Sequence, residues 1–420
     1  MDFVKRTMIS SGASQTKPSL RSAKDIPVSS ALNGLLVCVV LFPFVPAIIR
    51  SSDTQPTFTF VFCIALLTSF ALPAVGSRLF HISYWGVTAT VTLVFLLYFL
   101  LLLANLVDAR ASIPSRLFSF CQFCAAVVWA YSGKHEWTTK SLYRAMQIYL
   151  VFTFVYFLTN GLVENVLIHS RAALSASLFE SGRGARTLAP EPSFFAMQVF
   201  NIYLLYRLIE RRGVLRTNRL PFLALVSFCL VSSLSVYGAI ALLLILAVEF
   251  PKLFAFATLF VVSATSVAQG VLQQWGSVRA VSFILALVSS HGGIAKIFLL
   301  DASLASRVSS FLAYLSSFAA HPWTGNGFSL LQGGGFISIV TAFGLVGLLF
   351  FSWAFLKILT APYSRGTTVL LTVWFVMNFI SGPIGIPIIG VIFETVLSRS
   401  SVLFESRPYR AQRWQSLATT

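Results

Sequence analysis

Long apolar segments separated by short polar ones are the dominant pattern of this chain. A helix needs about 20 consecutive apolar residues to cross the hydrocarbon core of a membrane. Six apolar stretches reach or approach this length: 31–49, 57–75, 84–107, 143–162, 252–269 and 333–356. With shorter segments included, the candidate spans are 31–49, 57–75, 84–107, 117–131, 145–162, 192–208, 220–234, 236–250, 252–269, 333–356, 367–381 and 383–397. The pattern therefore predicts an all-α integral membrane protein with about twelve transmembrane helices.

The composition agrees with a chain that lies mostly in lipid. Of its 420 residues, 57% are hydrophobic and 10% are charged, and the mean hydropathy is +0.83. A globular domain in water carries about a quarter charged residues, so this chain has too few charges to cover a soluble particle. The five cysteines fall within apolar segments, where small buried side chains explain them better than a disulfide framework.

The basic residues set the expected orientation. The formal net charge is +17, but Lys and Arg lie between the apolar segments, as the positive-inside rule describes. No nucleic-acid partner is therefore expected. We predict a cytoplasmic tail over residues 1–30, a polytopic membrane domain over 31–400 and a basic cytoplasmic tail over 401–420.

Two long outer loops follow from this orientation, at about 163–191 and 270–332. The second contains apolar residues at helical spacing, which predict an amphipathic helix along the membrane surface: Leu304, Val308, Phe311, Leu315 and Phe318. Pro322 should end this helix at about His321. The apolar run at 280–289 is short, so the sequence leaves open whether this segment dips into the membrane.

The first loop ends in a pattern that favours an anion site. Pro192 suits the first turn of a helix, and Glu191 before it suits the positive end of the helix dipole. Two arginines, Arg183 and Arg186, stand close to this helix start and could bind phosphate. The same arginines could instead pair with Glu180 and Glu191, or with lipid headgroups, and the pattern alone does not choose.

The second loop offers further polar residues. Arg307 and His321 lie fourteen residues apart on the polar face of the expected helix, about 21 Å if the helix is straight. Both side chains could bind the same phosphate only if the segment between them folds back. Asp301 also fits a helix N-cap, and His321 a solvated loop residue. Gly325 and Gly327 would permit close approach of the backbone to a ligand.

Missing motifs narrow the chemistry. The chain has no phosphate-binding loop for nucleotide triphosphates and no HExxH zinc motif. No closely spaced acidic pair on a cytoplasmic loop could hold a metal-bound sugar nucleotide. We therefore expect no metal and no cofactor, and a substrate that carries its own leaving group. A lipid pyrophosphate fits, because arginines can stabilise departing phosphates while a His or a carboxylate takes a proton.

Several motifs together resemble one family. Arg183-Gly-Ala-Arg186, followed by Pro190-Glu-Pro-Ser-Phe-Phe-Ala196, is similar to the segment before a central helix in O-antigen and exopolysaccharide polymerases. Asp301-x-Ser-x-x-Ser-Arg307, with His321-Pro-x-x-Gly-x-Gly327, resembles the large periplasmic loop of the O-antigen polymerase and ligase superfamily. Leu234-Ser-Val-Tyr-Gly238 and Gly344-Leu-Val-Gly347 also match. The ordered set covers roughly residues 180–350, and the first 150 residues match only in hydropathy.

The resemblance implies a metal-independent glycosyltransferase with a GT-C-like membrane fold. Such an enzyme would work on the periplasmic face of the bacterial inner membrane, with both termini in the cytoplasm. It would transfer a growing glycan from undecaprenyl pyrophosphate to the next lipid-linked repeat unit. The implied partners are the lipid-linked oligosaccharide, membrane lipids and, as an option, a chain-length regulator.

The resemblance also implies roles for individual residues. Arg183, Arg186 and Arg307 would bind the pyrophosphate. Glu191 would organise these arginines or act as a base, and His321 would bind phosphate or assist proton transfer. Supporting positions are Pro192, Ser193, Gly325 and Gly327.

Two alternatives remain open at the level of sequence. An O-antigen ligase of the same superfamily would differ only in its acceptor. Some ligases use a second outer-loop histidine, which this chain lacks unless His291 fills that place, and this favours a polymerase. A transporter or flippase of lipid-linked oligosaccharide would instead place charged residues in mid-span, lining a path. The apolar segments carry their charges at the ends, which favours chemistry on an outer loop.

Overall fold

The computed structural model describes residues 37–44, 123–124, 126–127, 130, 138–161, 184–210, 219–256, 302–327, 335–381 and 386–405. Within these ranges all regular secondary structure is helical and there is no strand, as an all-α chain requires. The predicted segments 57–75 and 84–107, the N-terminal tail 1–30 and the possible membrane dip at 280–289 lie outside the described residues.

Nine helices have defined bounds in the described ranges. They are α6 (Thr139–Thr159), α8 (Pro192–Glu210), α9 (Arg219–Ser232), α10 (Val236–Glu249), α14 (Ala302–Ala320), α15 (Phe336–Phe343), α16 (Leu345–Thr360), α17 (Arg365–Ser381) and α18 (Pro387–Glu405).

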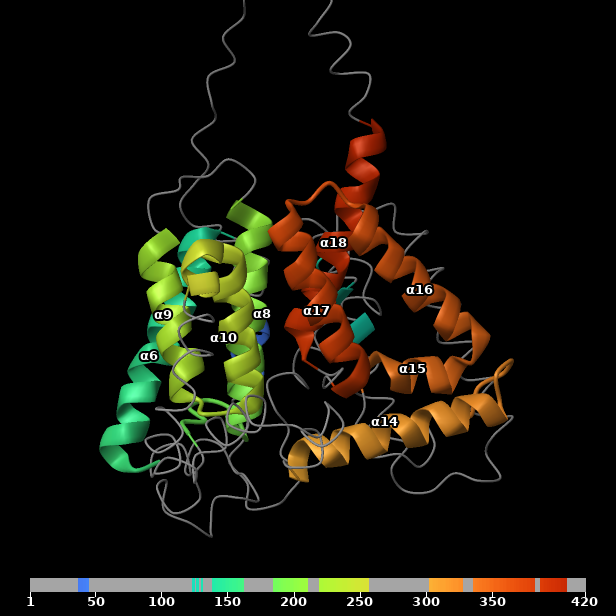
Figure 1. The fold of residues 1–420 in the computed structure, drawn as a ribbon, viewed down its shortest axis with the longest axis horizontal. Helices are drawn as coiled ribbons and strands as arrows, with labels where there is room; N and C mark the ends of the chain where they lie inside the picture. The colour runs from blue at the N-terminus through green and yellow to red at the C-terminus, as the bar shows by residue number, and fades with distance from the viewer. Residues whose placement is uncertain are drawn as a thin grey trace, which may run out of the picture.

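The helices form two adjoining groups. Figure 1 shows α6, α8, α9 and α10 standing together on one side, with α16, α17 and α18 on the other. Helix α8 joins them, because it contacts α6, α9 and α10 as well as α17 and α18. Helix α14 runs crosswise below the second group, next to the short α15 (Figure 1). This crossing helix lies in the second predicted outer loop and confirms the helix expected there.

Local capping moves some helix ends away from their predicted positions. Helix α6 begins six residues before the predicted segment 145–162, because the Thr138 side chain accepts a hydrogen bond from the Ser141 backbone and caps the helix. It ends where Asn160 adopts a left-handed conformation, with φ of 50°. Helix α18 begins at Pro387 and continues to Glu405, so it runs past the predicted segment 383–397 into the start of the predicted C-terminal tail.

The prediction of a single span over 333–356 was wrong. The chain forms α15 and α16 instead, separated by Gly344 with φ of 58°. The amides of Asn326 and Gly327 donate to the carbonyls of Thr341 and Ala342, at 2.9 and 3.2 Å. These carbonyls lie in the last turn of α15. They accept hydrogen bonds from the turn after α14, in place of the amides of a continuing helix, so α15 ends here.

Helix α8 has a polar interior face that binds its neighbours. The Gln198 amide donates to the carbonyls of Val40 and Leu41 at 3.0 and 3.1 Å, and the Tyr149 hydroxyl donates to Leu41 at 2.8 Å. The Asn201 side chain accepts from the Trp374 indole at 2.8 Å. Buried polar groups need such partners, because an unpaired one costs free energy. These bonds fix the position of α8 at the centre of the bundle.

Apolar side chains cover the outer faces of the bundle. On α6 the exposed stripe is Ile148, Val151, Phe154, Phe157 and Leu158, and on α16 it is Val346, Leu349, Phe350, Trp353, Leu356 and Leu359. The two helices lie on opposite outer sides of the bundle (Figure 1). Soluble monomers rarely expose continuous apolar stripes of this kind.

One helix in the described ranges, Thr139–Thr159, is long and apolar enough to cross a membrane by length and composition. Shorter apolar helices accompany it: Arg219–Ser232, Val236–Glu249, Leu345–Thr360, Arg365–Ile380 and Pro387–Leu397.

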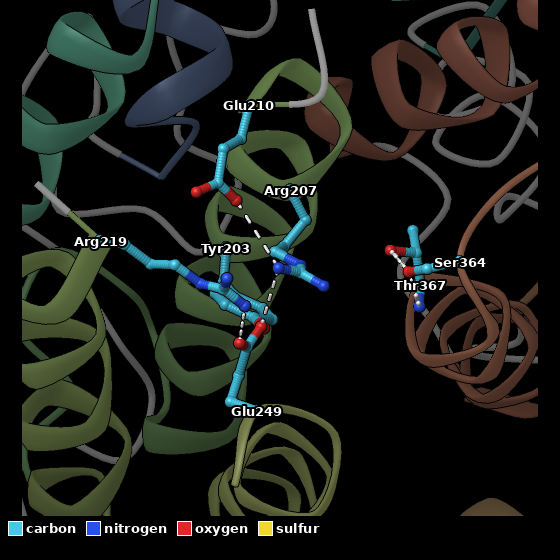
Figure 2. Close-up of polar contacts among 7 residues, drawn as sticks. All are labelled: Tyr203, Arg207, Glu210, Arg219, Glu249, Ser364 and Thr367. Atoms are coloured by element: carbon cyan, nitrogen blue, oxygen red, sulfur yellow. Dashed lines mark hydrogen bonds and ion pairs between the residues drawn. The ribbon is translucent and has the colours of Figure 1, made fainter. Parts of the chain in front are cut away.

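A buried network of charges ties together α8, α9 and α10 at one end (Figure 2). Glu249, whose side chain is 2% exposed, pairs with Arg207 at 3.1 Å and also with Arg219. Arg207 pairs in addition with Glu210 at 3.6 Å, and the Tyr203 hydroxyl donates to Glu249. Figure 2 also shows a separate polar pair at the start of α17, where the Ser364 and Thr367 hydroxyls lie 3.0 Å apart and the Thr367 amide donates to the Ser364 hydroxyl at 3.3 Å.

Candidate functional site

The loop before α8 is held against the turn between α9 and α10. The Ala185 amide donates to the Ser232 carbonyl at 2.8 Å, and the Tyr156 hydroxyl lies 3.5 Å from the Gly184 carbonyl. A Cβ atom at Gly184 would lie 2.4 Å from the Ser233 backbone, so only glycine allows this approach. Residues 184–189 are all buried. The segment expected to bind phosphate is therefore an ordered part of the bundle.

Backbone strain occurs on both sides of this contact. Thr187 has φ of 45° and Leu234 has φ of 44°. A positive φ is uncommon outside glycine and is an outlier for a β-branched residue such as threonine. Each such residue costs about 1–3 kcal/mol and persists where the surroundings enforce it, most often at functional sites. Both strained residues lie at the N-terminal end of α8, which makes this end a candidate functional site.

Three parts of the predicted site meet at the start of α8. The Arg307 guanidinium of α14 lies 3.4 Å from the Ser193 hydroxyl, which lies 3.4 Å from the Glu191 carboxylate. Arg307 donates to Ser193, and Ser193 donates to Glu191. Both contacts are long for hydrogen bonds, so a charged ligand could replace either one. The structure thus brings together Glu191, Pro192, Ser193 and Arg307, as a shared site requires.

Arg186 lies in the same loop, five residues before Glu191. It is buried, with 8% of its surface exposed, and its carbonyl accepts from the Ala189 amide at 2.9 Å. A buried guanidinium requires compensating partners or a ligand of negative charge. Arg183 and Glu180 lie outside the described residues.

Two helix N-termini add positive potential to this region. Helix α8 begins at Pro192, and α10 begins at Val236 after the Ser235 N-cap, whose hydroxyl accepts from the Gly238 amide at 3.0 Å. Helix N-termini attract anions through their unpaired amides and their dipole. A phosphate near Ser193 would meet this potential together with Arg307.

Two buried hydroxyls at the site have no hydrogen-bond partner in the described part of the chain. They belong to Thr187, which is fully buried, and to Tyr237 in the first turn of α10, which is 8% exposed. The motif Leu234-Ser-Val-Tyr-Gly238 contains Tyr237, and Thr187 directly follows the motif Arg183-Gly-Ala-Arg186, but the sequence gave neither residue a role. Only their burial, which no local pattern reveals, distinguishes them.

His321 lies apart from this cluster. It follows the last residue of α14, is exposed, and its carbonyl accepts from the Gly325 amide at 3.0 Å. Helix α14 is continuous from Ala302 to Ala320, so about 21 Å separates His321 from Arg307 along it. The segment does not fold back, and the structure does not bring these two residues together.

Gly325 and Gly327 shape the turn after α14. Their φ angles are 70° and 64°, which favours glycine. A Cβ atom at Gly325 would lie 2.3 Å from the Ala342 carbonyl oxygen. These glycines therefore let the turn pack closely against the end of α15. The sequence had suggested that they would let the backbone approach a ligand.

In the described ranges, no three His, Cys, Asp or Glu side chains converge where they could hold a metal ion. Comparison with protein-family models, with curated proteins and with solved structures finds no match to this chain.

Proposed function

We propose that the protein is a membrane-embedded polysaccharide polymerase. It transfers a glycan from undecaprenyl pyrophosphate to a lipid-linked repeat unit at the periplasmic face of the bacterial inner membrane, in a GT-C-like fold of about twelve spans. The observation that carries this proposal is the contact of Arg307 with Ser193, across 114 residues of sequence. It joins two of the motifs that resemble the polymerase family at one helix N-terminus.

The apolar outer stripes of α6 and α16 support the membrane part of the proposal, because lipid is the solvent in which such faces are stable. The interior side chains of Gln198 and Asn201 are polar and hydrogen-bonded. An apolar exterior around a partly polar, hydrogen-bonded interior is the arrangement expected of a helical bundle in a bilayer.

The proposed chemistry needs no group beyond the chain and its two substrates. A sugar hydroxyl of the acceptor attacks the anomeric carbon of the donor glycan and forms the new glycosidic bond. The bond from that carbon to the phosphate oxygen breaks, and the lipid diphosphate leaves with the electron pair. Arg186 and Arg307 stabilise its negative charge, and Glu191 accepts the proton of the hydroxyl. Arg183 has the same predicted role as Arg186.

His321 has no place in this step, since it lies about 21 Å along α14 from Arg307. It remains a candidate for contact with another part of a long substrate.

The transporter alternative requires charged side chains in mid-span. The network of Figure 2 involves Arg207, Arg219 and Glu249, which lie in the first or last turn of their helices. The ligase alternative shares the donor and differs in the acceptor, so the experiment must separate the two products.

The test is complementation of a deletion strain with wild type, Arg307→Ala, Ser193→Ala and, as a matched control, Arg365→Ala at an exposed position of α17. Surface polysaccharide is run on a gel and membrane protein level is measured. We expect the deletion to leave single repeat units, Arg307→Ala to fail, Ser193→Ala to give fewer long chains, and Arg365→Ala to restore them.

Accumulation of long chains on the carrier lipid in the deletion strain would make the protein a ligase. If Arg307→Ala restored long chains fully at a normal protein level, Arg307 would not be needed for the reaction, and the proposed site would be wrong.

A further inference from the structure

The hydroxyl of Tyr237 is a buried polar group for which the described residues provide no hydrogen-bond partner. It is 8% exposed, and no hydrogen bond to it is present in the described residues. A buried hydroxyl without a partner costs about 1–3 kcal/mol. Native structures retain few such groups, and each one requires a reason.

The backbone around Tyr237 is held rigidly. The next residue, Gly238, packs so closely that a Cβ atom would lie 2.3 Å from the Ser233 hydroxyl. The Tyr237 ring packs edge-on against Phe200 of α8, with ring centroids 6.4 Å apart. The hydroxyl is therefore fixed before any ligand arrives, which lowers the cost of binding one.

The surroundings of this hydroxyl favour a negatively charged ligand. The positive charge of Arg307 acts electrostatically on the Tyr237 hydroxyl. The N-terminus of α10, which carries Tyr237 in its first turn, adds positive potential. Thr187, in the neighbouring loop, has a second buried hydroxyl without a hydrogen-bond partner in the part of the chain that the structure describes.

We propose, on the premise that the proposed function holds, that the Tyr237 hydroxyl donates a hydrogen bond to a phosphate oxygen of the lipid diphosphate that Arg307 also binds. Tyr237 is then a substrate-binding residue. A tyrosine hydroxyl has one proton to donate, and a phosphate oxygen is a charged acceptor. This contact would satisfy a hydroxyl that has no hydrogen-bond partner among the described residues.

The test compares two buried tyrosines with opposite expectations. Tyr237→Phe removes a hydroxyl that has no partner in the described residues, whereas Tyr149→Phe removes one that donates to the Leu41 carbonyl at 2.8 Å. Purified protein in detergent is titrated with undecaprenyl pyrophosphate, with undecaprenol as the lipid that lacks phosphate. Thermal unfolding is followed with and without each lipid.

We expect Tyr237→Phe to unfold at or above the wild-type temperature without lipid and to bind the diphosphate about 10- to 100-fold more weakly, as the loss of a bond to a charged group implies. Tyr149→Phe should unfold at a lower temperature and bind the diphosphate as the wild type does. Both variants should bind undecaprenol as the wild type does.

Equal affinity of Tyr237→Phe and wild type, with Arg307→Ala weakened, would overturn the role of Tyr237 and leave the proposed function standing. A lower unfolding temperature of Tyr237→Phe without lipid would make the hydroxyl structural. Displacement of the probe by an equal concentration of phosphatidylglycerol would show a general headgroup site. Absence of binding by wild type would withdraw both proposals.

Discussion

At the scale of single residues, the site depends on close backbone contact. Gly184 lies against the turn between α9 and α10, where a Cβ atom would come within 2.4 Å of the Ser233 backbone and 2.5 Å of the Ser232 carbonyl oxygen. Backbone atoms cannot move aside as the end of a side chain can. The glycine thus fixes the loop that carries Arg186 against the start of α10.

We predict that Gly184→Ala lowers the free energy of unfolding by about 1–3 kcal/mol, the usual cost of overpacking, and reduces polymer synthesis. Gly366→Ala is the matched control, because its Cβ atom would meet only the Val248 side chain. Thermal unfolding in detergent and the polysaccharide gel measure the two effects. If Gly184→Ala matched Gly366→Ala in both, the loop would tolerate displacement.

At the scale of elements, α8, α9 and α10 form one unit with contacts at both ends. At one end the loop before α8 packs on the turn between α9 and α10, and at the other the three helices share the charge network of Figure 2. Glu249 is the common partner of Arg207 and Arg219. Removing one member of a buried ion pair leaves an uncompensated charge, which costs more than the pair itself contributes.

We predict that Glu249→Gln, which keeps the size of the side chain and removes its charge, lowers the free energy of unfolding by about 3–5 kcal/mol. Glu210→Gln should cost less, because Glu210 pairs only with Arg207, at 3.6 Å, among the contacts of this network. Urea or thermal unfolding of both variants checks this order. Equal losses would mean that Glu249 is not the centre of the network.

At the scale of the whole molecule, the site and the charge network lie at opposite ends of α8. This helix has 19 residues, which span about 28 Å, close to the roughly 30 Å of a hydrocarbon core. Under the proposed function, we expect the site end at one membrane surface and the network end at the other. Helix α14, which crosses below the bundle in Figure 1, lies at the site end of α8, where Arg307 contacts Ser193.

We predict that a membrane-impermeant maleimide labels Trp323→Cys from outside and labels Lys252→Cys only after permeabilisation. Both variants are made in a cysteine-free protein in spheroplasts. Trp323 is 75% exposed after α14, and Lys252 is exposed beyond the end of α10. The reverse pattern would place the site in the cytoplasm, and labelling of both in intact spheroplasts would contradict a membrane between them.

Features set by neighbouring residues could be predicted from the sequence. Pro192 starts α8 as expected, and α14 ends at Ala320, just before the break predicted at Pro322. The turn at 233–235 separates α9 from α10 where two segments were expected. Periodicity, caps and proline act within a turn or two of the chain, so a short stretch of sequence contains the information.

Contacts between distant segments were decided by the tertiary structure. Three features each depend on segments distant in the sequence: the contact of Arg307 with Ser193, the ending of α15 at Gly344, and the Tyr237 hydroxyl, which has no partner among the residues that the structure describes. The separation of His321 from Arg307 also depends on α14 staying straight. Such features follow from how helices pack, because burial and partners belong to the assembled bundle, whereas helix starts and ends are properties of the local chain.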